Sequence, residues 1–119
     1  MANPIIDRAK AHFAALDRIL VEVPEWGDES GPLVIHGSPW NMEQKGRLSR
    51  YYKESGWAEM VVRALIMKAT DAQGKPLFTL DDRKHLLLDV DPAVLDRVGA
   101  ALMAGATPGE GAVEDAAKN

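Results

Sequence analysis

The apolar residues of segment 57–69 recur at helical spacing and give the clearest periodicity in the chain. The stripe contains Trp57, Met60, Val61, Ala64, Leu65 and Lys68. Apolar residues at steps of three and four share one face of an α-helix, so this segment predicts a helix with Trp57 turned toward the core. A chain of 119 residues is long enough for one domain around such a core.

Four more segments predict helices, and each follows a helix-start signal. The segments are 5–18, 40–54, 80–88 and 91–104. The signals are Asn3 with Pro4, Ser38 with Pro39, Thr79 with Asp82, and Asp91 with Pro92. A short polar side chain caps a free backbone N–H, and proline has no N–H to leave unpaired. Gly56 is expected to interrupt the second of these helices, and Gly105 to end the last.

Two short runs near the N-terminus predict a β-hairpin over residues 19–36. The runs are 19–23 (ILVEV) and 33–36 (LVIH), separated by a segment rich in turn formers and acids. Pro24 is expected to end the first strand, which leaves residues 24–32 as a loose tip.

The expected fold class is mainly α (α+β): a small helical domain with one hairpin near the N-terminus. Two short strands cannot supply a core, so the helices must supply most of it. Residues 1–105 form the single predicted domain. The small and acidic residues 106–119 predict a flexible tail.

Composition argues against several classes of function. The chain has no cysteine, which excludes disulfides, thiolate metal sites and cysteine nucleophiles. Lys and Arg number 14 against 18 Asp and Glu, a net charge of −4 that counts against a phosphate-binding nucleic-acid partner. No apolar run approaches the length of a membrane span. We therefore expect a soluble, cytoplasmic protein with no nucleic-acid or membrane partner.

No residue pattern predicts catalysis. Asp81 and His85 stand four positions apart, a legitimate spacing for metal ligands, but nothing in the sequence requires a third ligand. A solvated helix face with an ion-pair contact is the favoured interpretation. The serines lie in no nucleophile motif, and no glycine-rich loop is followed by the lysine of a phosphate site. We expect no enzyme activity, no cofactor and no metal.

Charge is distributed unevenly along the chain. Residues 21–31 carry acids without Lys or Arg, whereas residues 45–53 carry bases without an acid. One interpretation is a solvated basic face steered against the acidic loop. The other is a docking surface, because Arg and Tyr are enriched at protein interfaces. The candidate partner-binding residues are Trp40, Arg47, Arg50 and Tyr51.

Trp26 and Trp40 flank the predicted hairpin. They are expected to pack on each other across it; an exposed pair would instead provide an anchor for a partner.

Two strings and their order resemble one protein family. Val21–Gly27 (VEVPEWG) leads into the hairpin, and Asp71–Asp82 (DAQGKPLFTLDD) is followed by the helix at Asp91–Leu102 and the tail Val113–Asn119 (VEDAAKN). In this order they resemble the tail assembly chaperones of long, non-contractile-tailed phages. The basic, tyrosine-containing segment 40–56 departs from the family pattern.

The resemblance implies a non-enzymatic role in tail morphogenesis in the cytoplasm of the infected cell. Such proteins bind the tape measure protein, keep it soluble, help to recruit tail tube subunits, and are absent from the finished virion. The family often makes a longer product by frameshifting, and self-association as a homo-oligomer stays open.

Two alternatives remain at this stage. One is a virion structural component, such as a head-tail connector or tail completion protein. The other is a small nucleic-acid-binding regulator that uses residues 45–53.

Overall fold

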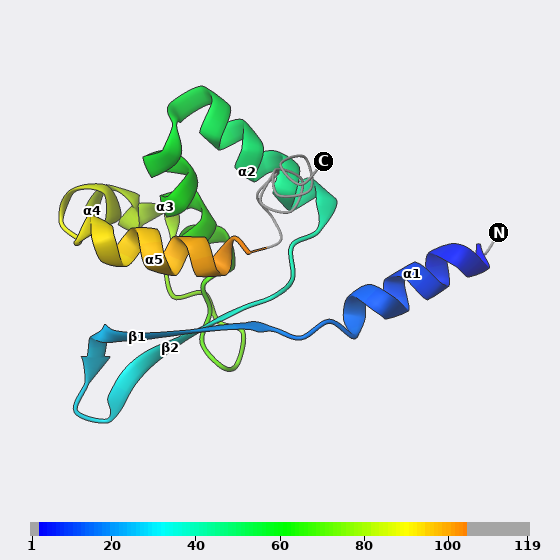
Figure 1. Cartoon of the computed structure of the whole chain (residues 1–119), viewed down its shortest axis with the longest axis horizontal. Helices are drawn as coiled ribbons and strands as arrows, with labels where there is room; N and C mark the ends of the chain where they lie inside the picture. The colour runs from blue at the N-terminus through cyan, green and yellow to red at the C-terminus, as the bar shows by residue number, and fades with distance from the viewer. Residues whose placement is uncertain (1–2, 105–119) are drawn as a thin grey trace, which may run out of the picture.

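The fold is a small α+β domain, mainly helical, as the sequence predicts. A computed structural model describes residues 3–104. In chain order the elements are α1 (Pro4–Ala14), β1 (Ile19–Asp28), β2 (Gly31–Gly37), α2 (Met42–Ser55), α3 (Trp57–Lys68), the 3-10 turn η1 (Leu80–Asp82), α4 (Arg83–Leu88) and α5 (Pro92–Leu102). Helices α2 to α5 gather into a bundle, the hairpin runs beneath α5, and α1 projects away from the rest (Figure 1).

The hairpin is longer and tighter than predicted. Antiparallel pairing runs from Ile19 opposite Gly37 to Val23 opposite Leu33, is irregular beyond that, and resumes at Asp28 opposite Gly31. The expectation that Pro24 ends the strand was wrong. Pro24 has no N–H to donate, so it marks the irregular stretch, yet β1 continues to Asp28.

Helix α3 lies at the centre of the core. Its inward residues pack against α2, α4 and α5, and the inward residues of the hairpin complete the cluster. The largest fully buried side chains are Val23, Ile35, Leu48, Val62, Leu65, Val98, Leu102 and Met103. Lys68, on the predicted stripe, is buried with them at 3% exposed.

The start of α2 differs from the prediction. Asn41, not Ser38, is the N-cap. Its side-chain oxygen accepts from the Gln44 N–H at 2.8 Å, and the side-chain oxygen of Gln44 accepts from the Asn41 N–H at 3.1 Å. Ser38 instead accepts a hydrogen bond from the Lys68 ammonium at 3.0 Å. Gly56, at φ +89°, separates α2 from α3 as expected.

Three of the predicted helix starts are confirmed. Asn3 caps α1, with Pro4 at the first helical position, by accepting from the N–H groups of Ile5 and Ile6. The Thr79 N–H bonds to the Asp82 carboxylate at 2.9 Å, which forms the capping box that opens η1. Asp91 caps α5 by accepting from the Ala93 N–H at 3.0 Å. Gly105 and the predicted tail 106–119 lie outside the described residues.

Helix α1 has no buried residue. Every residue from Asn3 to Arg18 is exposed, including Ile5, Ile6 and Phe13. The helix is amphipathic as predicted, but the body of the domain does not cover its apolar face (Figure 1). Among residues 3–104, no helix is long and apolar enough to cross a membrane.

Candidate functional site

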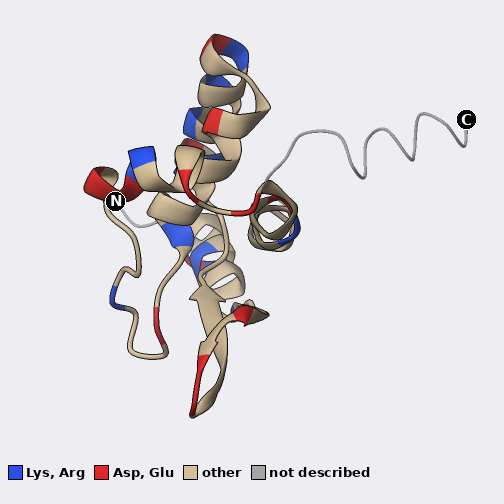
Figure 2. Cartoon of the chain, turned by 90° about the vertical axis from the view of Figure 1, so that its left-hand side faces the viewer, with Lys and Arg blue, Asp and Glu red and all other residues tan. Residues whose placement is uncertain are grey.

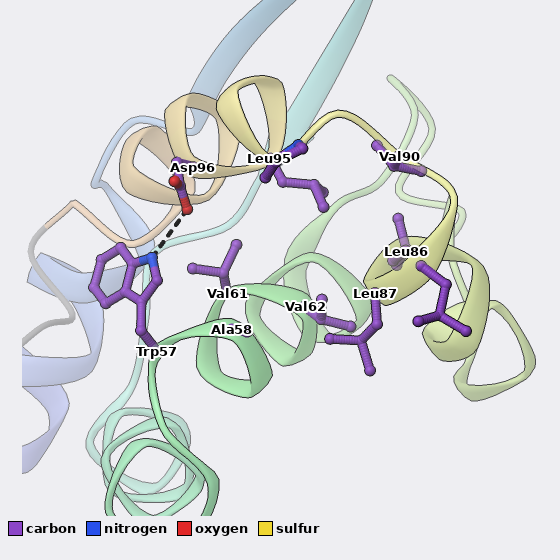
Figure 3. Close-up of a pocket in the computed structure, with 11 residues that line it drawn as sticks. Trp57, Ala58, Val61, Val62, Leu86, Leu87, Val90, Leu95 and Asp96 are labelled. Atoms are coloured by element: carbon purple, nitrogen blue, oxygen red, sulfur yellow. Dashed lines mark hydrogen bonds between the residues drawn. The ribbon is translucent and has the colours of Figure 1, made fainter.

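An open apolar groove lies where α3, α4 and α5 meet (Figure 3). Its volume is about 350 Å³, at the lower end of the range for ligand-binding cavities. The residues that line it are Trp57, Ala58, Val61, Val62, Leu86, Leu87, Leu88, Val90, Pro92, Leu95 and Asp96. Such a surface can take apolar side chains from another molecule, as in the docking of an amphipathic helix.

The floor of the groove depends on a close approach of α5 to α3. Gly99 is buried, and a Cβ at this position would lie 2.7 Å from Cγ1 of Val61. Real Cβ atoms essentially never come so close, so a larger residue would push the helices apart. Glycine thus allows the close packing in which Val61 of α3 and Leu95 of α5 line the same groove (Figure 3).

The wall formed by α4 is apolar because three leucines follow one another on a six-residue helix. Consecutive residues point about 100° apart, so a single neighbouring surface cannot bury all three. Leu86 is buried, Leu87 is half-buried, and Leu88 is 69% exposed. The side of the groove therefore offers apolar surface to solvent.

Trp57 closes one end of the groove. Its indole N–H donates to Oδ1 of Asp96 at 2.9 Å, across from α3 to α5 (Figure 3). The prediction that Trp57 is a core residue was wrong, since 47% of the residue is exposed. It lies at the first position of α3, at the end of the apolar stripe.

One acidic side chain lines the groove, and two others lie on the connection beside it. Of the eleven residues that line it, Asp96 alone is charged. Asp89 and Asp91 are exposed on the connection from α4 to α5, which Figure 2 shows as acidic positions leading into α5. The groove thus combines an apolar floor with three acidic side chains on its α5 side.

A carboxylate held by two arginines fixes α4 against α3. Glu59 is buried and accepts hydrogen bonds from Nε of Arg63 and Nε of Arg83, each at 2.8 Å. The hydrogen bonds from Arg83, then those from Arg63, lower the pKa of Glu59 to about 2 against the opposing effect of burial. This cluster positions the leucine wall of the groove.

A second ion pair joins the hairpin to α5. Arg97 donates from both terminal nitrogens to the two oxygens of Glu25, at 2.6 and 2.7 Å. The hydrogen bond from Arg97 lowers the pKa of Glu25 to about 2. The acidic hairpin therefore pairs with α5, and not with the basic segment 45–53 as one interpretation of the sequence expected.

Trp40 contributes to the fold. Its indole N–H donates to the backbone oxygen of Leu102 at 2.7 Å, and the Lys68 ammonium lies 5.1 Å from the ring centroid. The predicted packing of Trp26 on Trp40 was wrong. Trp26 meets Phe78 edge to face, with ring centroids 6.2 Å apart.

The other three candidate residues share one stretch of α2. Arg47 pairs with Glu43 at 3.0 Å, while Arg50 is exposed and forms no ion pair with residues 3–104. Tyr51 is half-buried beneath the guanidinium of Arg63, which lies 4.7 Å from its ring centroid. Their spacing makes the three neighbours on the helix surface. Contact of Trp40, Arg47, Arg50 and Tyr51 with a partner stays a prediction.

The Asp81 and His85 pair does not form the predicted contact. Nδ1 of His85 lies 3.1 Å from Oδ2 of Asp89, one turn further along the chain. In the part of the chain that the structure describes, no three His, Cys, Asp or Glu side chains are grouped to hold a metal ion.

Comparisons with protein-family models, with curated protein sequences and with solved structures find no match to this chain.

Sequence reasoning missed the groove residues Trp57, Leu88 and Asp96. One signal in the sequence could have indicated the α4 wall of the groove: one face of a short helix cannot bury three successive leucines at 86–88. The other two walls depend on how α3 and α5 are placed in space, which no local pattern specifies.

Proposed function

We propose that this chain is a tail assembly chaperone of a long, non-contractile-tailed phage and that its groove binds helices of the tape measure protein. The observation that carries the proposal is the open apolar groove between α3, α4 and α5. A long helical protein exposes apolar faces until its tube forms around it. A groove with an apolar floor can cover such a face, which is a common mode of helix recognition.

The two strings that resemble the chaperone family support this proposal, because they pack against each other. Trp26 belongs to the first string and Phe78 to the second, and their rings are in edge-to-face contact. The second string leads through Thr79 and Asp82 directly into α4, which forms the leucine wall. The strings thus help to build the element that borders the groove.

A modest interface suits the role. The client must leave the chaperone when tube subunits polymerise, so binding has to be reversible. A groove of about 350 Å³ accommodates a few side chains rather than a large surface, which fits a small interface of the transient kind. The proposed place of action is the host cytoplasm, with no place in the finished virion.

Co-expression tests the proposal. The tape measure protein of the same phage is expressed with the wild-type chain, with Leu88→Glu, and with the control Met42→Glu. Leu88 is 69% and Met42 80% exposed, so neither change removes core packing. We expect the wild type and Met42→Glu to keep the tape measure protein soluble and Leu88→Glu to fail. Equal precipitation with and without the wild-type chain would refute the chaperone role.

A further inference from the structure

Helix α1 carries an apolar stripe that its own molecule leaves uncovered. Ile5 is 61%, Ile6 48% and Phe13 40% exposed. At 100° per residue these three share one face with Ala9, while Asp7 lies on the opposite face. The stripe is of the kind that fits an apolar groove.

The helix is also too short to be stable in isolation. It has 11 residues, whereas isolated helices shorter than about 12–15 residues are marginal in water. The Asn3 side chain caps it by accepting from the N–H groups of Ile5 and Ile6 at 2.9 and 3.3 Å. The cap satisfies two donors but does not shield the stripe, so a partner surface would stabilise α1.

The groove of the same molecule lies on the opposite side of the domain from α1 (Figure 1). Figure 1 shows α1 on one side of the domain and α4, the leucine wall, on the other. As α1 is placed in Figure 1, its stripe can therefore meet a groove only in a second molecule.

The charges of the two surfaces are complementary. Arg8 and Lys10 flank the stripe on its two sides. The groove has Asp96 in its lining and Asp89 and Asp91 beside it. Basic flanks on the helix could thus face the acidic side chains on the α5 side of the groove, which favours this pairing over two copies of α1 with their like charges together.

We infer that the α1 stripe of one molecule docks in the α3–α4–α5 groove of a second copy of this chain. The two surfaces differ, so the contact is heterologous, and each pair of molecules retains one free α1 and one free groove. Association then proceeds head to tail. If the proposed function also holds, a docked α1 competes with client helices for the same groove.

Sedimentation equilibrium of the full chain alone tests the inference, without any client. One variant, the arm variant, disrupts the apolar stripe of α1 by the changes Ile6→Glu and Phe13→Glu. A second, Leu88→Glu, blocks the groove, and Met42→Glu is the control for an exposed apolar residue elsewhere. We expect the wild type and the control to show a weight-average mass that rises above 13.0 kDa with concentration. Each blocked variant should weaken association at least about tenfold.

An equimolar mixture of the two blocked variants gives the decisive measurement. The arm variant keeps a free groove and the groove variant keeps a free arm, so the mixture should form a one-to-one dimer and nothing larger. A mixture that stays monomeric overturns the inference. The inference is also overturned if the wild type is monomeric at all concentrations, or if the groove variant still self-associates. Failure of the client experiment would leave this result unaffected.

Discussion

Trp26 and Phe78 lie edge to face, with ring centroids 6.2 Å apart and planes at 76°. The contact joins the hairpin to the loop that precedes η1, two segments more than 50 residues apart in sequence. Both rings are half-buried and pack against the main core. The pair therefore connects the hairpin to the segment that leads into the leucine wall of the groove.

Removal of either ring should lower the free energy of unfolding. We expect Trp26→Ala and Phe78→Ala each to cost about 2 kcal/mol, less than for fully buried aromatics. The double variant should show a coupling of about 0.5–1.5 kcal/mol. Urea denaturation followed by circular dichroism gives the four values of the cycle. Strictly additive losses would mean that the rings stabilise the domain independently.

Two glycine-to-alanine changes should act in opposite directions. Gly46 lies inside α2, and a Cβ there meets open space, so Gly46→Ala should stabilise the domain by about 0.5–1 kcal/mol. Gly99 lies inside α5, where the new Cβ would lie 2.7 Å from Cγ1 of Val61. Overpacking costs about 1–3 kcal/mol, so Gly99→Ala should destabilise the domain.

The shift in the midpoint of urea denaturation measures both effects. Val61→Ala combined with Gly99→Ala makes room for the new methyl group, so the double variant should lose less than the two single losses together. A stabilising Gly99→Ala would show that α3 and α5 do not approach as closely as described.

Glu59 should make the stability of the domain depend on pH. Its pKa falls from 4.5 to about 2 in the folded state, chiefly because Arg83 donates to it. A lowered carboxyl pKa stabilises the fold above pH 4.5, and this contribution disappears as the pH falls from 4.5 to about 2. We expect Glu59→Gln to lower the free energy of unfolding by about 2 kcal/mol at neutral pH.

The difference between the wild type and Glu59→Gln should therefore shrink toward zero near pH 2. Glu54→Gln is the matched control, since Glu54 is exposed and forms no ion pair with residues 3–104. Its difference from the wild type should stay small over the same range. A Glu59→Gln difference that does not change with pH would contradict the assignment of the charge to this cluster.

The sequence predicts well where helices and strands occur, but poorly which residues pack against them. The stripe of α3 and the capping signals at Thr79 and Asp91 are local. The structure confirms both caps and buries every residue of the stripe except Trp57. Ser38 and Asn41 are both good caps, so local preference could not choose between them. The choice depends on Lys68, which lies 30 positions away and takes Ser38 as its hydrogen-bond partner.

The candidate site was less predictable for the same reason. An amphipathic pattern shows that a face is apolar, but not whether another element covers it. Trp57 and Phe13 both lie on such faces and both remain exposed. The groove exists because Gly99 lets α5 approach α3, and the partner of that glycine cannot be identified from one sequence.

The last prediction compares Trp40 and Trp57, each of which donates one indole hydrogen bond. Trp40 donates to the backbone oxygen of buried Leu102, the last residue of α5, at 2.7 Å. Trp57 donates to the carboxylate of exposed Asp96 at 2.9 Å. Carbonyl groups in the last turn of a helix have no partner within the helix, so Trp40 satisfies an acceptor that would otherwise be unpaired.

Trp40→Phe keeps an aromatic ring but leaves that buried oxygen without its donor, which should cost about 1–3 kcal/mol. Trp57→Phe should cost less than about 1 kcal/mol, because water can replace the indole N–H at an exposed carboxylate. Thermal unfolding followed by circular dichroism compares the two variants directly. If Trp57→Phe were the more destabilising of the two, Trp40 would not have the structural role assigned to it.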